Sequence, residues 1–284
     1  EKFGNTMALY ALGQESKLAV EDSRETIAKS LNGDTHEIIF TGSASESNNL
    51  ALKGVALANR KKGKHIIISR IEHPCVMESS IWLEKQGFEV TRLAVDEYGR
   101  IDPADVESSI RKETTLVSIM HANNEIGTIE PIKEIGEICG EEVKFHTDAA
   151  QTFGKLRIDA KKMNIDLLTA SSHKVYGPKG AACLYLKDGT KIEPILHGGG
   201  HESGLRSGTV NVPAVVGFAE ATKICLEEIE KEAENLTRLR GKLIDNVLNI
   251  ENSVLNGHPS LRLPSNANFS FDFAEGESMV LLLD

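Results

Sequence analysis

The 284-residue chain is poor in cysteine, and its four cysteines are scattered as Cys75, Cys139, Cys183 and Cys225. None belongs to a C-x-x-C pair or to another metal-ligand spacing, so the sequence predicts no metal site. Dispersed thiols in a chain of this length indicate a reducing compartment. The first residues also lack the basic start and apolar centre of a secretory signal. We therefore expect a cytoplasmic protein.

Long apolar runs and excess positive charge are also missing. No run reaches the roughly 18 apolar residues of a membrane helix, so no membrane association is expected. Lysine and arginine total 32 against 42 aspartates and glutamates, which gives a net charge of -10. Nucleic-acid binding needs a basic face, so no nucleic-acid partner is expected. The sequence has no Walker A, G-x-G-x-x-G or H-E-x-x-H motif, so nucleotide and zinc-protease functions gain no support.

Apolar runs of strand length alternate with amphipathic stretches from about residue 36 to residue 187. This alternation predicts an α/β fold with right-handed crossovers and a mostly parallel sheet flanked by helices. We expect a large domain over residues 1–230. Residues 231–284 then form a connector helix and part of a smaller α+β C-terminal domain.

Polar residues gather directly after the apolar runs, where ligands bind in open α/β sheets. This pattern favours one shared site. Its candidate residues are Ser43 to Ser47, His73, Asn123, Asn124, Asp148, Gln151 and Ser171 to Lys174.

Lys174 and Asp148 carry the most specific chemistry. Lys174 could be an ordinary surface lysine, and Asp148 could cap a following helix. A desolvated lysine can instead form a Schiff base, and a carboxylate can pair with a heterocyclic nitrogen. Pyridoxal phosphate requires both groups, so the pair favours that cofactor.

Three further features fit such a cofactor, although each is weak evidence alone. The Ser-rich helix start after Gly42 could hold a phosphate, or could be only a helix cap. His73 could stack on the cofactor ring and move protons, or could be a packed histidine. The loop 197–209 contains three consecutive glycines; it could be a flexible surface loop, or could approach a ligand or second subunit with Arg206 and Thr209 as anion contacts.

With these residues identified, the chain closely resembles the NifS/IscS-type cysteine desulfurases, pyridoxal-phosphate enzymes of the aspartate-aminotransferase fold. The resemblance covers almost the whole chain. It rests on the segments "TGSASESNNLALKG", "IEHPCV", "LVSIMHANNEIGTI", "HTDAAQTFGKL", "SSHKVYGPKG" and "HGGGHESGLRSGT".

The resemblance implies a role for each matching residue. Lys174 would carry the cofactor, and Asp148 would pair with its ring nitrogen. Gln151 would bind the ring oxygen, and His73 would stack on the ring and assist proton transfer. The remaining implied contacts are Ala44, Ser45, Ser171 and His173 to the phosphate, Asn124 to the substrate and the ring oxygen, and Thr209 to the phosphate of a neighbouring subunit, which implies a homodimer.

The implied reaction takes sulfur from L-cysteine, releases L-alanine and leaves an enzyme persulfide for an iron–sulfur scaffold or another acceptor. The four cysteines of this chain match no nucleophile position of the family. We expect the chain to be a fragment, with that cysteine outside it; a naturally short chain is the alternative. Two other functions stay open at this point. They are another pyridoxal-dependent C–S or C–Se lyase, such as a selenocysteine lyase or β-lyase, and a non-catalytic cofactor-binding partner.

Overall fold

The computed structural model describes residues 3–284 and contains one large sheet and one small sheet. The seven strands of the large sheet come from the alternating apolar runs of the sequence. They are β1 (Ile38–Thr41), β2 (His65–Ser69), β3 (Glu89–Leu93), β4 (Thr114–Ser118), β5 (Lys144–Asp148), β6 (Leu167–Ser171) and β7 (Ala182–Leu186).

The large sheet is mostly parallel, as predicted. Its strand order is β1-β7-β6-β5-β4-β2-β3, and only β7 runs antiparallel to its neighbours, β1 and β6. Because β1 to β6 share one direction, their carboxyl ends meet at one edge of the sheet. The loops that follow these strands therefore converge there.

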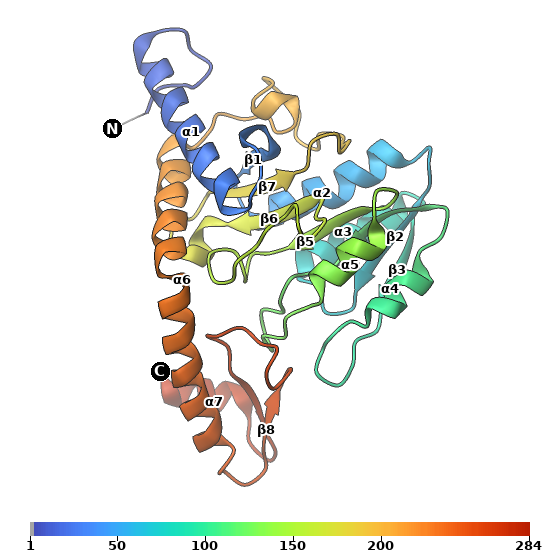
Figure 1. Ribbon diagram of the computed structural model, residues 1–284, viewed down its shortest axis with the longest axis vertical. Helices are drawn as coiled ribbons and strands as arrows, with labels where there is room; N and C mark the ends of the chain where they lie inside the picture. Colours follow the sequence, from blue (N-terminus) through green and yellow to red (C-terminus); the bar gives the residue numbers. More distant parts are fainter. Residues whose placement is uncertain (1–2) are drawn as a thin grey trace.

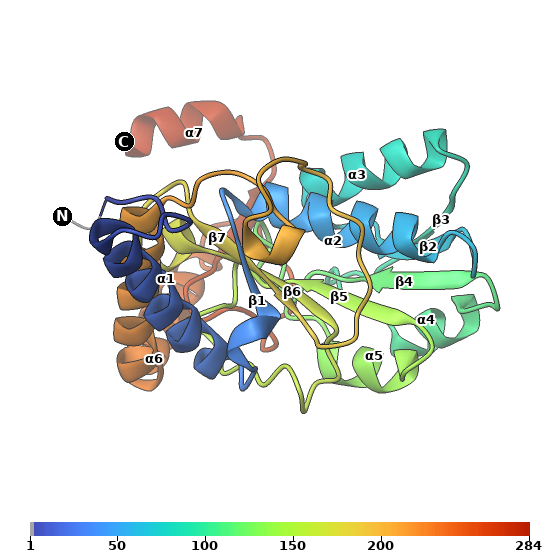
Figure 2. The ribbon, with the colours of Figure 1, turned by 90° about the horizontal axis from the view of Figure 1, so that it is seen from above.

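Helices cover both faces of the sheet, which gives three layers (Figure 2). One face carries α2 (Ala44–Asn59) and α3 (Pro74–Lys85). The other face carries α1 (Ala11–Ser30), α5 (Ile132–Cys139) and the first half of α6 (Val212–Val247). Helix α4 (Pro103–Ser109) connects β3 to β4.

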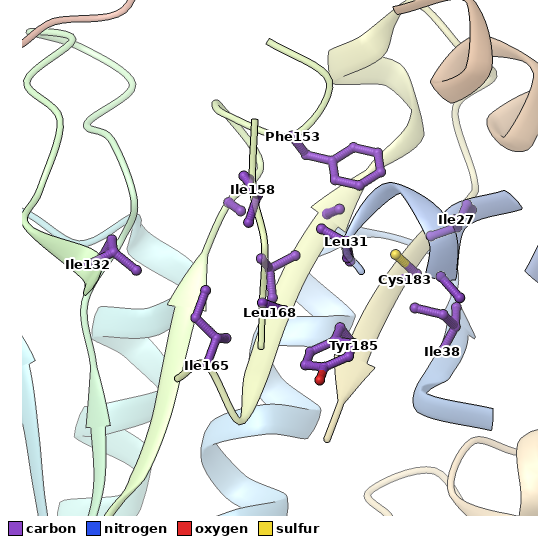
Figure 3. Packing of buried hydrophobic residues seen from close by; sticks show 14 of the residues in the cluster. Ile27, Leu31, Ile38, Ile132, Phe153, Ile158, Ile165, Leu168, Cys183 and Tyr185 are labelled. Atoms are coloured by element: carbon purple, nitrogen blue, oxygen red, sulfur yellow. The ribbon is translucent and has the colours of Figure 1, made fainter. Parts of the chain in front are cut away.

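Successive side chains along each strand point to opposite faces of the sheet and so contribute to two separate hydrophobic cores. In β2, Ile66 and Ile68 pack toward α2 and α3, whereas Ile67 belongs to the core on the opposite face. Figure 3 shows the second core, where Ile27 of α1 and Leu31, directly after α1, share a cluster with Cys183 and Tyr185 of β7. Both sheet faces are thus buried, as expected for strands that read as continuous apolar runs.

Helix α6 lies along one side of the molecule and reaches beyond the large sheet (Figure 1). It has 36 residues and passes residue 230 without a break. Beyond it lie β8 (Ser253–Asn256), its antiparallel partner β9 (Asn268–Phe271) and α7 (Gly276–Leu283). The division of the chain at residue 230 stays a prediction.

The segment between β8 and β9 is tied to the loop after β4. Leu263 N donates to Gly127 O at 2.9 Å, and Asn266 Nδ2 donates to Glu125 O at 2.9 Å. Arg262 is buried and donates to Ile126 O at 3.0 Å. These bonds hold the loop that carries Asn124. Over residues 3–284, no helix combines the length and the apolarity that a bilayer crossing requires.

Candidate active site

A cavity of about 310 Å³ opens where the parallel strands end. Every residue to which the family resemblance gave a role lines it except Thr209, which is exposed. Of the wider set of candidates at the strand ends, Glu46, Ser47, Asn123 and Ser172 do not line it. The lining residues are Ser43, Ala44, Ser45, His73, Cys75, Met120, Ala122, Asn124, Asp148, Ala150, Gln151, Ser171, His173 and Lys174. Residues more than 100 positions apart in sequence thus share one site.

Asp148 is the last residue of β5 and is buried, with 6% of its surface exposed. Its Oδ1 accepts from Ala150 N at 2.9 Å, and its Oδ2 accepts from Asn48 Nδ2 at 2.6 Å. Burial raises the pKa of Asp148, and these two bonds and the charges of His73 and Lys174 oppose that rise. The residues after Asp148 form turns and not a helix, so the helix-cap alternative is wrong. Asp148 is a desolvated carboxyl group that a cationic ligand atom would stabilise as the anion.

Lys174 lies in a short 3-10 helix, Ser172–Val175, directly after β6. Strand β6 ends at Ser171, and Lys174 follows on the next turn. Lys174 is half-buried and lines the cavity, and it forms no ion pair with any residue of the described chain. Its amine is therefore positioned for a ligand.

An anion seat is formed where α2 begins. Ser43 caps the helix by accepting from Glu46 N at 3.2 Å, and Ala44 and Ser45 occupy the first turn. Backbone N–H groups of a first helical turn have no partner within the helix, and the helix dipole favours an anion there. Opposite them, Ser171 Oγ lies 3.0 Å from His173 Nδ1. Burial and the neighbouring Lys174 and Lys179 lower the pKa of His173, which therefore favours the neutral ring.

The structure corrects one part of the anion-binding prediction. Gly42 N donates to Glu46 Oε2 at 2.8 Å, so the Gly42 amide is already occupied. Arg206 Nε donates to Glu46 Oε1 at 2.6 Å and neutralises that carboxylate. Arg206 thus binds a protein carboxylate and is not available to a ligand as a free cation.

Two neighbouring asparagines have different roles. Asn124 lines the cavity together with Gln151, as predicted. Asn123 does not line it: its Nδ2 donates to Ile71 O at 3.0 Å, and its Oδ1 accepts from Glu125 N at 2.9 Å. The side chain of Asn123 therefore holds the conformation of the loop, and only Asn124 of the two lines the cavity.

Sequence reasoning missed two polar contributors, Asn48 and Cys75. Asn48 is fully buried in the second turn of α2, four residues after Ala44. Residues four apart share a helix face, so this spacing could have identified it. Cys75 lies in the first turn of α3, and only the packing of α3 beside α2 brings it into the site.

These groups fit pyridoxal phosphate by their chemistry. A primary amine, a buried carboxyl group and an anion seat line one cavity, and they match the aldehyde, ring nitrogen and phosphate of that cofactor. Within residues 3–284, no three histidine, cysteine, aspartate or glutamate side chains come together to hold a metal ion.

Comparison with known proteins agrees with this architecture. The aminotransferase class-V family profile matches residues 2–284. The chain belongs to the class-V aminotransferase family. Cysteine desulfurase IscS of Methanosarcina thermophila is 51% identical over 285 residues, and the match covers all of this chain and 70% of that protein. Cysteine desulfurase IscS 1 of Archaeoglobus fulgidus is 49% identical and is covered over 74% of its length.

Solved structures of class-V relatives superpose closely. A NifS-like protein matches with a TM-score of 0.97 and 39% identity, over 100% of this chain and 78% of the other. The structure of SspA in complex with cysteine matches with a TM-score of 0.86 and 39% identity, over 99% and 79% of the two chains. The predicted fold and the predicted family are therefore confirmed.

Proposed function

We propose that this protein is a pyridoxal-phosphate-dependent cysteine desulfurase. The observation that carries the proposal is the convergence of Lys174, Asp148 and His73 on one cavity in a chain about 50% identical to proteins named cysteine desulfurase. The substrate is L-cysteine, and the products are L-alanine and a persulfide on a cysteine thiol.

The residues of the cavity would hold the cofactor at three points. Lys174 would bond to its aldehyde carbon, Asp148 would pair with its ring nitrogen, and the first turn of α2 would hold its phosphate together with Ser171 and His173. Gln151 would bind the ring oxygen. When bound, pyridoxal phosphate supplies a ring that withdraws electrons from the substrate Cα.

The chain's own residues then handle the substrate and its protons. Lys174 Nζ takes the proton from the substrate Cα, because it is the cavity's only primary amine among the described residues. His73 lies on the same cavity and moves a proton at its Nε2 atom. Asn124 orients the substrate. Met120 and Ala122 line the cavity with apolar surface that excludes water.

The proposal extends to the assembly and the pathway. Thr209 lies outside its own cavity and is exposed, which suits a contact with the cofactor phosphate of a second copy in a homodimer. The persulfide sulfur would pass to an iron–sulfur scaffold or another acceptor protein. The proposed location is the cytoplasm, and the four free cysteines support it, because disulfides are rare in reducing compartments.

The test is a product assay on the purified full-length protein with pyridoxal phosphate, L-cysteine and a dithiol reductant, which accepts the sulfur from the persulfide. We expect alanine and sulfide in equal amounts, and visible absorbance from the bound cofactor. Lys174→Ala should abolish both signals, whereas Lys179→Ala, an exposed lysine outside the cavity, should retain them. Cofactor absorbance without alanine formation would overturn the desulfurase assignment, and turnover of other thioethers in place of cysteine would indicate a β-lyase.

A further inference from the structure

We propose that Cys75 is a positioning residue for His73, and that Asn48 joins this thiol to Asp148 in one hydrogen-bonded bridge. The bridge spans α2, α3 and the end of β5. Its links are Asp148 Oδ2 to Asn48 Nδ2 at 2.6 Å, Asn48 Nδ2 to Cys75 Sγ at 3.1 Å, and Cys75 Sγ to His73 Nδ1 at 3.0 Å. The catalytic consequence rests on the proposed function, whereas the bridge itself does not.

The direction of the first two links follows from Asp148. An ionised carboxylate only accepts hydrogen bonds, so the Asn48 amide must present its nitrogen to Asp148 and not its oxygen. The same nitrogen carries a second hydrogen, which it donates to Cys75 Sγ. The thiol sulfur is therefore the acceptor in this link, and its own hydrogen is left to donate elsewhere.

The third link and the backbone bond that caps α3 together favour one histidine tautomer. Cys75 N donates to His73 Nδ1 at 3.2 Å, because His73 caps the start of α3. Since Nδ1 accepts this backbone bond, it carries no proton, and the Cys75 thiol becomes its second donor. The proton of the neutral ring is then on Nε2. No residue in the described range bonds Nε2, so this atom is left for a ligand in the cavity.

The surroundings of Cys75 keep its thiol protonated, so that it can donate a hydrogen bond. Burial raises the pKa of the thiol, and the negative charge of Asp148 adds to that rise, while the bond from Asn48 opposes it. A protonated thiol can donate to Nδ1, whereas a thiolate cannot. Cys75 therefore acts here through hydrogen bonding and not as a nucleophile.

The bridge is tested by the protonation of the His73 ring nitrogens. Histidine-selective nitrogen-15 NMR on the purified protein, with and without bound cofactor, distinguishes the two tautomers, and His73→Gln assigns the signal. We expect an unprotonated Nδ1 in the wild type and in Cys75→Ser, whose hydroxyl keeps a donor. In Cys75→Ala only the backbone donor remains on Nδ1, so we expect a larger share of the Nδ1-protonated tautomer than in the wild type. A His73 signal that is identical in all three proteins overturns the bridge.

Kinetics test the consequence for catalysis. Cys75→Ala should lower kcat for L-cysteine by about three- to tenfold, the effect of one neutral hydrogen bond, while KM changes by less than about twofold. Cys75→Ser should restore kcat to within about twofold of the wild type. Cys225→Ser is the matched control, because this thiol lies in α6 away from the cavity.

The two readouts separate the possible failures. If the tautomers respond as expected but the wild type forms no alanine, the bridge stands and the proposed function fails. If the wild type is active and Cys75→Ala matches it in both tautomer and kcat, the positioning role is wrong. Loss of kcat in Cys75→Ala without rescue by Cys75→Ser would also contradict it.

Discussion

Asn48 Nδ2 lies 2.6 Å from Asp148 Oδ2, and both side chains are buried between the sheet and α2. Asn48 is thus the only side-chain donor to this carboxylate within the described structure. It opposes the burial that raises the pKa of Asp148. The ability of Asp148 to hold a cationic ring nitrogen depends on that neighbour.

Asn48→Ala should therefore weaken pyridoxal-phosphate binding. Hydrogen bonds to charged groups contribute about 1.5–3 kcal/mol, so the dissociation constant should rise by about tenfold or more. Titration of the cofactor-free protein, followed by visible absorbance, measures the change. Asn59→Ala is the control, because Asn59 lies at the far end of α2 and its side chain bonds only Val55 O in the described chain. An unchanged dissociation constant in Asn48→Ala would refute this dependence.

Glu72 should make the protein less stable as pH rises. Burial raises the pKa of Glu72 to about 8, and the nearby Asp148 and Glu130 add to the rise, although Ser69 and Met120 donate to its Oε1. The folded state therefore keeps this proton where the unfolded state has already released it. The free energy of unfolding should fall between about pH 4.5 and pH 8, with a limit of about 1.4 kcal/mol per pH unit for one group.

Glu72→Gln removes that contribution, because the amide mimics the protonated carboxyl group and can still accept both hydrogen bonds. Urea unfolding of the cofactor-free protein at pH 5.5, 6.5 and 7.5 should show a shallower decline for Glu72→Gln than for the wild type. The exposed Glu78→Gln serves as the control and should follow the wild type. Parallel curves for all three proteins would contradict the prediction.

Arg24 and Glu202 should contribute strongly to stability and to the placement of the glycine-rich loop. Arg24 donates to both carboxylate oxygens, at 2.7 and 2.8 Å, and the two side chains are 10% and 4% exposed. Phe40 N also donates to Glu202 Oε2 at 2.7 Å, which ties the loop to β1. Loss of one partner leaves a buried charge, so Glu202→Ala or Arg24→Ala should cost about 3–5 kcal/mol of unfolding free energy.

A double-mutant cycle measured by urea unfolding isolates the Arg24–Glu202 interaction. The double alanine variant should lose much less than the sum of the two single variants. The exposed pair Lys29 and Glu25 provides the comparison and should show a coupling below about 1 kcal/mol. Additive losses for Arg24 and Glu202 would show that they stabilise the protein independently.

Local sequence patterns predicted most of the sheet, because each buried strand is a short apolar run with a polar exit. They did not predict that β7 pairs with β1, since that pairing joins segments about 140 residues apart. The first half of α6 was also missed. Residues 212–226 are rich in alanine and valine, and a short apolar segment of this kind has no clear helical periodicity.

The site was predictable where its residues end a strand, as Asp148 does, or come shortly after one, as Lys174 does. Asn48 and Cys75 lie on helix faces, so the contact of Asn48 with Asp148 and the place of Cys75 in the cavity depend on how α2 and α3 pack. The ion pair of Arg206 with Glu46 could not be predicted either, because the two residues are 160 positions apart in the sequence. Sequence order therefore indicated which elements form the site, and tertiary packing determined which side chains complete it.

The position of β1 has a consequence for biogenesis. This strand is at the edge of the sheet, and its partner β7 begins only at Ala182. The start of α2, which follows β1, provides the anion seat. Glu46 in its first turn is paired with Arg206. A ribosome must therefore deliver more than two thirds of this chain before the seat can assemble, because non-local pairings form only after both partners exist. Under the proposed function, the cofactor phosphate therefore has no complete binding site until residue 206 has been synthesised.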